Sequence, residues 1–319
     1  MRGWPEWICP SDQQPLEQQS NQLSCAAGHV YPIIKGIPRF VSQSNYADHF
    51  GAQWNRYRLT QLDSYTGRPI TRDRARRCLG EQLWESLSGK TILECGCGAG
   101  RFTEILLERG ARVTSIDLSN AIEANALTFP QSERHRCGQA DITLLPFAPA
   151  QFDVVVCLGV IQHTPSPERT VEALSRQVAP GGTLVIDHYT DGFGWYTRTA
   201  APLHAILKRL QPGSALKATE SLVKLFLPLH KAVRGRRLSS MLLHRLSPVM
   251  CYYAMFPELN DQIQYEWALL DTHDTLTDWY KHFRSRDQIR SMLEKLELEH
   301  IWCEYGGNGV EARGSRPPA

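Results

Sequence analysis

The chain has 319 residues, of which 42% are hydrophobic and 21% charged, and its formal net charge is +2 at pH 7. This composition provides a sizeable core and excludes wholesale disorder, and no apolar run approaches the ~20 residues that span a bilayer. The first residues lack the apolar stretch of a secretory signal. Nine cysteines scattered over so long a chain do not form the dense framework of a secreted disulfide-rich domain. We therefore expect a reduced, cytoplasmic protein.

Residues 1–41 contain a short pattern of metal-binding residue types, formed by Cys9, Asp12, Cys25 and His29. The pattern resembles a small, β-rich zinc-ribbon-like module, whose metal-binding versions have Cys-x2-Cys followed by Cys-x3-His. Here Asp12 replaces the second cysteine. Because tetrahedral zinc accepts carboxylate oxygen, the four residues are candidate ligands. The alternative is a degenerate ribbon that keeps its fold without metal.

Residues 42–88 are rich in aromatic and polar side chains and predict a helical connector. Residues 89–190 then alternate short β-branched runs with helical patterns, which predicts a parallel sheet covered by helices on both faces. The predicted strands and helices are, in chain order, strand 91–94, helix 102–109, strand 111–117, helix 120–127, strand 152–158, helix 167–178 and strand 183–187.

A glycine-rich run from Glu94 to Gly100 follows the first of these strands, and Asp117 ends the second. Glycines permit a tight strand-to-helix turn and let backbone N–H groups approach a ligand closely. A carboxylate before the first glycine suits an ammonium or sulfonium better than a pyrophosphate. A carboxylate at the position of Asp117 is suited to the hydroxyls of a ribose.

These motifs, with those that follow, resemble the class I S-adenosylmethionine (SAM)-dependent methyltransferases over residues 89–190. The resemblance implies a Rossmann-like, doubly wound α/β sheet, mostly parallel with an antiparallel last strand, and SAM as the cofactor. The residues that it places around SAM are Glu94, Gly96, Gly98 and Gly100 in the first motif, Asp117 and Leu118 at the ribose and adenine, Asp141 and Ile142 at the adenine, and Leu158 in the fourth motif. In the connector, Arg56, Gln61 and Arg68 are candidates for contacts with the cofactor's carboxylate.

Two features of this segment have alternative interpretations. Cys95 and Cys97 could be a metal or redox pair, but we interpret them as small residues between glycines. His163 follows the fourth motif, where the family faces the transferable methyl, and is a candidate general base for an oxygen or nitrogen acceptor. The alternative is that His163 only holds its loop by a hydrogen bond.

The acceptor is predicted to be a small or amphipathic molecule, methylated on oxygen, carbon or nitrogen. The fourth motif lacks the Asn/Asp-Pro-Pro-Tyr/Phe run and the Pro-Cys pair of nucleic-acid enzymes, and resembles the ubiquinone- and menaquinone-type branch. Four further residues are candidate acceptor contacts, each with packing as the alternative: His188, Tyr189, Tyr280 and His282.

Residues 191–284 are predicted to form a basic helical lid. Between residues 192 and 256 there are ten Lys or Arg and a single acid, Glu220, and leucines recur at helical spacing. Such a basic amphipathic insert suits an anionic membrane surface or an anionic substrate. A solvated face is the alternative.

Residues 285–319 are predicted to complete the core, with a capping box at Ser285 before a helix and then two strands. The sequence thus predicts a methyltransferase with a small-molecule acceptor. A nucleic-acid partner is disfavoured, yet the Cys/His module and the basic insert keep an RNA methyltransferase as one alternative. A catalytically silent SAM-binding scaffold is the other.

Overall fold

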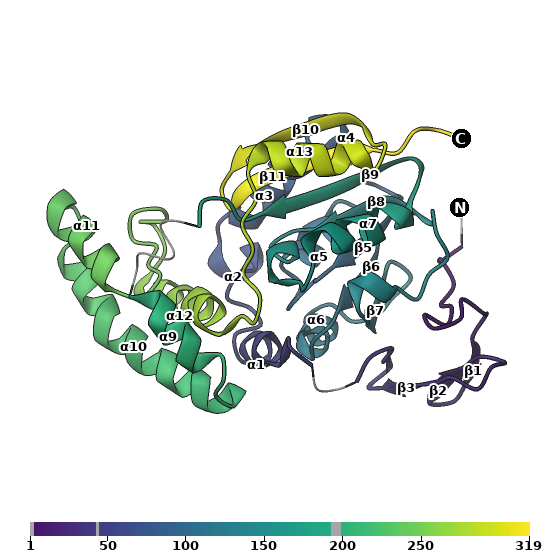
Figure 1. The fold of residues 1–319 in the computed structure, drawn as a ribbon. Helices are drawn as coiled ribbons and strands as arrows, with labels where there is room; N and C mark the ends of the chain where they lie inside the picture. Colours follow the sequence, from purple (N-terminus) through teal and green to yellow (C-terminus); the bar gives the residue numbers. More distant parts are fainter. Residues whose placement is uncertain (1–2, 43–44, 193–198) are drawn as a thin grey trace.

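A seven-stranded sheet forms the centre of the protein in the computed structural model, which describes residues 3–42, 45–192 and 199–319 (Figure 1). The strand order is β10-β11-β9-β8-β5-β6-β7. The strands are β5 (Thr91–Cys95), β6 (Arg112–Asp117), β7 (His135–Gln139), β8 (Phe152–Cys157), β9 (Val178–His188), β10 (Glu299–Gly306) and β11 (Gly309–Ser315). Strands β5 to β9 are parallel, and β11 is antiparallel to both of its neighbours. The predicted fold class is confirmed.

The central strands are buried on both faces, which explains their continuous apolar runs. Leu93 and Cys95 pack toward α7 (Pro167–Gln177) and α13 (Arg286–Lys295), whereas Ile92 packs toward the opposite layer. That second layer consists of α3 (Ile70–Leu79), α4 (Glu81–Glu85) and α5 (Arg101–Glu108). The alternation of side chains along a strand therefore builds a three-layer α/β/α core.

Strand β9 begins at Val178, earlier than the predicted strand 183–187, because residues 180–182 form an irregularity within the strand. Phe152 pairs with Val178, but Val154 pairs with Thr183. A Cβ on Gly182 would lie 2.8 Å from two carbonyl oxygens, so this crowded backbone requires glycine.

A four-stranded antiparallel sheet precedes the central one. Its strands are β1 (Glu17–Gln19), β2 (Gln22–Ser24), β3 (Val30–Ile34) and β4 (Ile37–Pro38). The backbone N–H of Phe40 donates to the Gln139 carbonyl on the β7 edge, and Trp7 stacks on Phe147 with ring centroids 4.8 Å apart. The N-terminal sheet thus docks beside β7, as the purple segment in Figure 1 shows.

Helices of the insert lie at the opposite end of the molecule (Figure 1). They are α9 (Ala200–Leu207), α10 (Pro212–Ala232), α11 (Arg237–Leu246) and α12 (Asp261–Thr277). Val223 and Leu227 of α10 pack on Ala268 and Leu269 of α12. The insert predicted over residues 191–284 contains these helices in its described part, and we call residues 199–284 the lid. In the described ranges, no helix is long and apolar enough to cross a membrane.

The remaining elements connect these parts. Before the sheet lie α1 (Asp48–Arg56) and α2 (Asp63–Thr66), and within it α6 (Ala121–Thr128) and the short 3-10 turns Ile142–Leu144 and Ile161–His163. The capping box predicted at Ser285 is present, since its hydroxyl accepts from Gln288 N–H and the Gln288 side chain accepts from Ser285 N–H.

The docking of the N-terminal sheet generates a stability prediction. The Arg39 guanidinium is buried and donates to Glu123 at 2.8 Å and to Gln139 at 3.1 Å, whereas Lys35 bonds the same Glu123 from solvent. Arg39→Met should lower the free energy of unfolding by about 3 kcal/mol, because it leaves polar partners unpaired. Lys35→Met, the matched control, should cost less than about 1 kcal/mol. Equal losses of unfolding free energy in the two variants, measured by urea denaturation, would contradict this prediction.

Candidate functional site

A cavity of about 1280 Å³ opens at the carboxyl ends of the central strands, between the sheet and the lid. Gly96 and Gly98 after β5, Asp117 of β6 and Leu158 after β8 line it from the sheet, and Tyr252 and Trp267 line it from the lid. The chain order reverses between β5 and β8. Crevices at such a switch point are where open α/β sheets bind ligands.

The glycine loop has a backbone that other residues would strain. Gly96 has φ of 72°, and a Cβ there would lie 2.3 Å from Val160 Cγ2. Its N–H and that of Cys97 donate to the Ile116 carbonyl, which ties the loop to the neighbouring strand. The loop is thereby held at the floor of the cavity. Cys95 and Cys97 are both buried, as space-filling residues would be.

Asp117 is fixed by three hydrogen bonds. Its Oδ2 accepts from Gly98 N–H at 2.9 Å, and its Oδ1 accepts from the backbone and the hydroxyl of Ser119 at 2.8 and 2.7 Å. Burial raises the pKa of Asp117, although these donors oppose the shift. Leu118, Asp141 and Ile142 also line the cavity. Seven of the nine predicted SAM contacts thus line the cavity, namely Gly96, Gly98, Asp117, Leu118, Asp141, Ile142 and Leu158.

Glu94 and Gly100 do not line the cavity. Glu94 lies beneath the loop, where its Oε2 accepts from Thr103 Oγ1 at 2.5 Å and from Ser115 Oγ at 3.0 Å, and its Oε1 has no hydrogen-bond partner among the described residues. Burial raises the pKa of Glu94 to about 7. Gly100 has φ of 102° and begins α5.

The connector places two of its three candidate carboxylate contacts at the cavity. Gln61 and Arg68 line it, whereas Arg56 lies 3.7 Å from Glu220 on the surface. Arg101, which was not among the predicted site residues, also lines the cavity and donates to Gln61 Oε1 at 2.8 Å. Burial, and then the charge of Arg74, lower the pKa of Arg101 to about 10. The position of Arg101 directly after the glycine loop is the sequence signal that could have identified it as a site residue.

His163 lines the cavity with its imidazole between two lid carboxylates. Its Nδ1 lies 2.9 Å from Asp278 Oδ2, and its Nε2 lies 3.8 Å from Asp274 Oδ1. Burial opposes the imidazolium form, but the two carboxylates outweigh it and raise the pKa of His163. Nε2 has no hydrogen-bond partner among the described residues. The arrangement is that of a base with an orienting acid.

Of the four predicted acceptor contacts, only Tyr189 lines the cavity, with its ring edge-on to His163 at 5.2 Å between centroids. His188 is buried elsewhere and donates from Nδ1 to the Tyr189 carbonyl at 2.8 Å, and burial lowers its pKa to about 4. Tyr280 packs on Tyr46, and His282 stacks on Tyr280. From the same segment, Lys281 lines the cavity instead.

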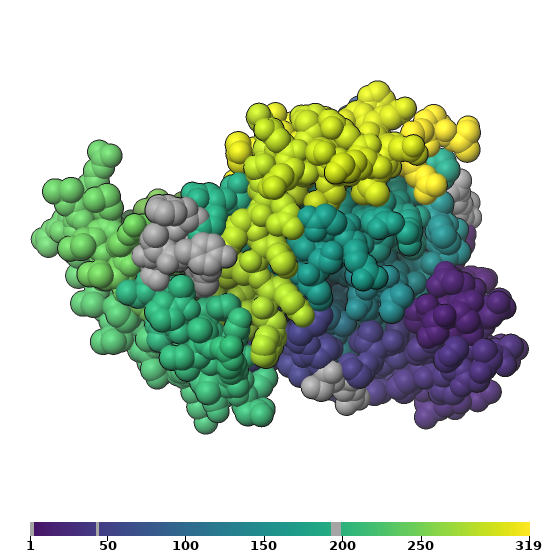
Figure 2. Space-filling view, in the orientation of Figure 1, coloured from purple at the N-terminus to yellow at the C-terminus, as the bar shows by residue number. Residues whose placement is uncertain are grey.

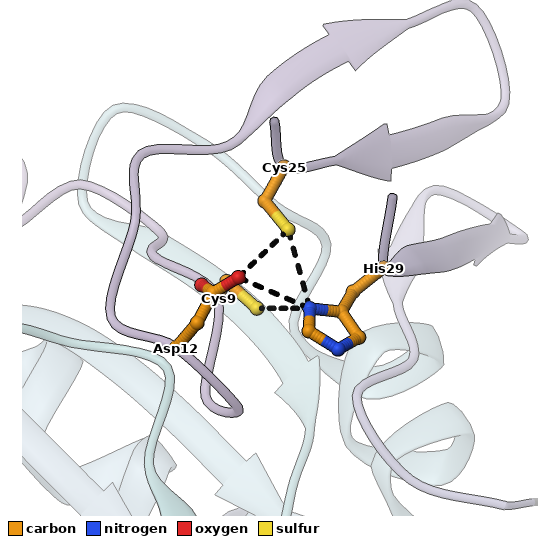
Figure 3. A group of neighbouring side chains, drawn as sticks. All are labelled: Cys9, Asp12, Cys25 and His29. Atoms are coloured by element: carbon orange, nitrogen blue, oxygen red, sulfur yellow. Dashed lines mark hydrogen bonds and ion pairs between the residues drawn. The ribbon is translucent and has the colours of Figure 1, made fainter. Parts of the chain in front are cut away.

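The four predicted metal ligands of the N-terminal sheet converge (Figure 3). His29 Nδ1 lies 3.5 Å from Cys9 Sγ, 3.3 Å from Cys25 Sγ and 3.1 Å from Asp12 Oδ2, and Cys25 Sγ lies 3.2 Å from the same oxygen. Bonds of 2.0–2.3 Å in a tetrahedral zinc site separate the ligand atoms by about 3.3–3.8 Å. The donor types and their spacing therefore fit zinc.

Comparisons with known proteins agree with this site. Residues 93–186 match the family described as methyltransferase domain. Ubiquinone biosynthesis O-methyltransferase of Azoarcus sp. strain BH72 is 34% identical over 135 residues, which cover 40% of this chain and 56% of that protein. The enzyme of the same name from Pseudomonas paraeruginosa is 39% identical over 103 residues, which cover 31% and 44%.

The chain spans about half the length of the curated relatives it matches. Among solved structures, an S-adenosylmethionine-dependent methyltransferase from Mesorhizobium loti has a TM-score of 0.45 and 14% identity, over 77% of this chain and 98% of that one. The family match over residues 93–186 includes the glycine loop and Asp117.

The raised pKa of Glu94 predicts how stability depends on pH. Because its folded pKa is about 7, against an ordinary value of 4.5, the folded state binds more protons between these values. The contribution of Glu94 to the free energy of unfolding should therefore be greatest below pH ~4.5 and fall by about 3 kcal/mol as pH rises through ~7. In Glu94→Gln that loss should be missing. Urea denaturation of the ligand-free proteins at a series of pH values measures the difference, and parallel curves would contradict it.

Proposed function

We propose that this chain, whose residues 93–186 belong to the class I SAM-dependent methyltransferase domains, methylates a hydroxyl group of an amphipathic small molecule. The observation that carries the proposal is the His163 imidazole, which faces the cavity beside the glycine loop and is backed by the Asp278 carboxylate. The names of the curated relatives favour oxygen as the acceptor atom.

The residues at the carboxyl ends of β5 and β6 fit SAM. We assign Asp117 to the ribose hydroxyls, since its Oδ2 keeps a lone pair after the bond to Gly98, whereas its Oδ1 already accepts two hydrogen bonds from Ser119. Arg101 and Gln61 are suited to the cofactor's carboxylate by charge and position. When bound, SAM supplies an electrophilic methyl on a sulfonium.

His163 then acts on the acceptor. Its Nδ1–H donates to the Tyr280 carbonyl at 3.2 Å and lies beside the Asp278 carboxylate, which leaves the Nε2 lone pair to take the proton of an acceptor hydroxyl as the oxygen attacks in line. The imidazolium that forms is stabilised by Asp278 and by Asp274. The neutral imidazole is the active form, so the raised pKa places the acid limb of the pH profile above the ordinary value of ~6.5.

The cavity suits an acceptor with aromatic or apolar parts. Its volume exceeds the ~300–1,000 Å³ of most single-ligand pockets, so it has room for SAM and an acceptor together. The wall on the acceptor side is largely aromatic, and its members are Tyr46, Phe50, Tyr189, Tyr252, Phe256 and Phe283.

Replacement of His163 tests the catalytic assignment. His163→Gln should lower kcat by ~10²–10⁴ with a panel of hydroxylated amphipathic acceptors, because the general base is lost. SAM affinity by calorimetry should stay within about threefold of wild type. His188→Gln, a buried histidine outside the cavity, is the matched control and should retain turnover.

Asp278→Asn should shift the acid limb of the pH profile of kcat to lower pH than in the wild type, because it removes one of the two charges that raise the pKa of His163.

Unchanged turnover in His163→Gln would refute the assignment of His163 as the general base. Failure of the wild type to bind SAM would refute the proposed function as a whole.

We also propose that Cys9, Asp12, Cys25 and His29 bind a structural zinc ion. The convergence of two sulfurs, a nitrogen and a carboxylate oxygen in a module with short strands supports this. Small modules of this kind draw much of their folding energy from the metal.

Cys25→Ser should therefore lose one zinc per chain in metal analysis of the purified protein and lower the melting temperature. Cys303→Ser, a buried cysteine of β10 outside the cluster, should keep the metal. Equal zinc contents in the two variants would remove the proposal.

Finally, we propose that α10 and α11 bind an anionic membrane surface, where an amphipathic acceptor resides. Leu225, Leu238, Met241, Leu242 and Leu246 are 54–77% exposed, amid the exposed cations Lys224, Arg234, Arg236, Arg237 and Arg245. These helices form the outer end of the molecule (green in Figure 2). Arg198 lies outside the described residues.

Vesicles of phosphatidylglycerol should retain the protein at low salt, and Arg234→Glu with Arg237→Glu should weaken retention at least ~10-fold, since each cation contributes ~1 kcal/mol. The control pair Arg134→Glu with Lys295→Glu changes as much charge away from the lid and should have little effect. Equal retention of the two double variants on the vesicles would contradict the proposal. Retention of RNA but not vesicles would favour the RNA alternative.

A further inference from the structure

Three side chains of the lid meet where α10, α11 and the loop after α11 pack together. The ligand atoms of His230, His244 and Cys251 all lie within 4.8 Å of one another. Cys251 Sγ is 3.3 Å from His244 Nε2. The two imidazole rings are 4.7 Å apart between centroids and nearly perpendicular, at 73°. This cluster is separate from the cofactor cavity, because none of the three residues lines it.

His244 is oriented as a ligand would be. Its Nδ1 lies 2.7 Å from the Ser240 carbonyl oxygen. A carbonyl only accepts, so Nδ1 carries the proton and donates it, and the Nε2 lone pair faces Cys251. Metal-bound histidines are commonly held by such a bond from the second ring nitrogen.

His230 supplies an independent observation. Its side chain is 3% exposed, and neither of its ring nitrogens has a hydrogen-bond partner among the described residues. Buried polar atoms without a partner are costly, and native proteins usually satisfy them. A cation bound by His230, His244 and Cys251 would satisfy one of these nitrogens.

We infer that His230, His244 and Cys251 form a second metal site, in the lid, that binds Zn²⁺. Two imidazole nitrogens and one thiolate are donors that zinc prefers, and three protein ligands leave a fourth position for water. His244 and Cys251 are partly exposed, which gives the ion a route from solvent. On binding, the Cys251 thiol releases its proton to solvent, since the thiolate is the ligand.

The site would order the lid. α11 has no buried residue in its whole length, so apolar packing holds it weakly. Cys251 stands between Met250 and Tyr252, which both line the cavity, and the Tyr252 hydroxyl donates to Asp271. Zinc would therefore join α11 and α10 to the segment that walls the acceptor side of the cavity.

Zinc titration of the full-length chain, after removal of metal with a chelator, tests the inference. Wild-type protein should bind one zinc more than Cys251→Ser and His244→Gln, whereas Cys303→Ser should match the wild type. The same comparison in a Cys25→Ser background separates this site from the N-terminal cluster. Equal zinc binding by wild type, Cys251→Ser and His244→Gln would overturn the inference.

Hydrogen exchange gives a second readout that does not depend on counting metal. One equivalent of Zn²⁺ should slow amide exchange in residues 237–246 and 250–256 by at least ~10-fold in the Cys25→Ser protein. The slowing should be absent when Cys251→Ser is added. Exchange that is unaffected by zinc in both proteins would also overturn the inference.

Discussion

The buried carboxylate of Asp278 holds the lid on the sheet. Its Oδ2 lies 2.9 Å from His163 Nδ1 and 2.6 Å from Lys281 Nζ, and its Oδ1 lies 2.9 Å from His204 Nε2. Burial alone would raise its pKa, but these three groups outweigh that effect and hold the pKa well below its usual range. His204 belongs to α9 and His163 to the turn after β8. One charge thus fixes the lid helices against the turn that carries the proposed base.

Side chains of one type have different pKa values in this chain, because their surroundings differ. His163 lies beside two carboxylates and has a raised pKa, whereas burial dominates at His188 and His273 and lowers their pKa values to about 4 and about 3. Only His163 faces the cavity. The same logic applies to the carboxylates, since Glu94 has only hydroxyl partners and a pKa of about 7, while Asp278 has cationic ones.

Local patterns were sufficient to predict most of the central sheet and the glycine loop, because buried parallel strands are apolar runs and tight turns require glycine. Strand β7 was not predicted, because its sequence is polar. His135 bonds Ser115, and Gln139 bonds Arg39, which lies 100 residues away in the N-terminal sheet. Such a strand owes its stability to tertiary partners that no local pattern reveals.

The candidate site was predictable to the extent that its residues follow strands. Asp117, Leu158 and His163 fall at the cavity for that reason, whereas the lid contacts depend on how a long insert folds back. The segment around Tyr280 was predicted to contact the acceptor. Its residues that take part in the site are instead Lys281, which lines the cavity, and Asp278, the ion-pair partner of Lys281. The Glu94 side chain lies beneath the loop rather than in the cavity, because Thr103 and Ser115 donate hydrogen bonds to it there.

In the proposed mechanism, His163 Nε2 lies beside the methyl group to be transferred. A crystal structure with S-adenosylhomocysteine measures this arrangement through the distance between the ligand's sulfur and Nε2. An acceptor oxygen between them requires roughly 5–7 Å, the sum of an attack distance and a hydrogen bond, with the ribose on Asp117. A sulfur more than ~10 Å from Nε2, or separated from it by protein, would contradict the account.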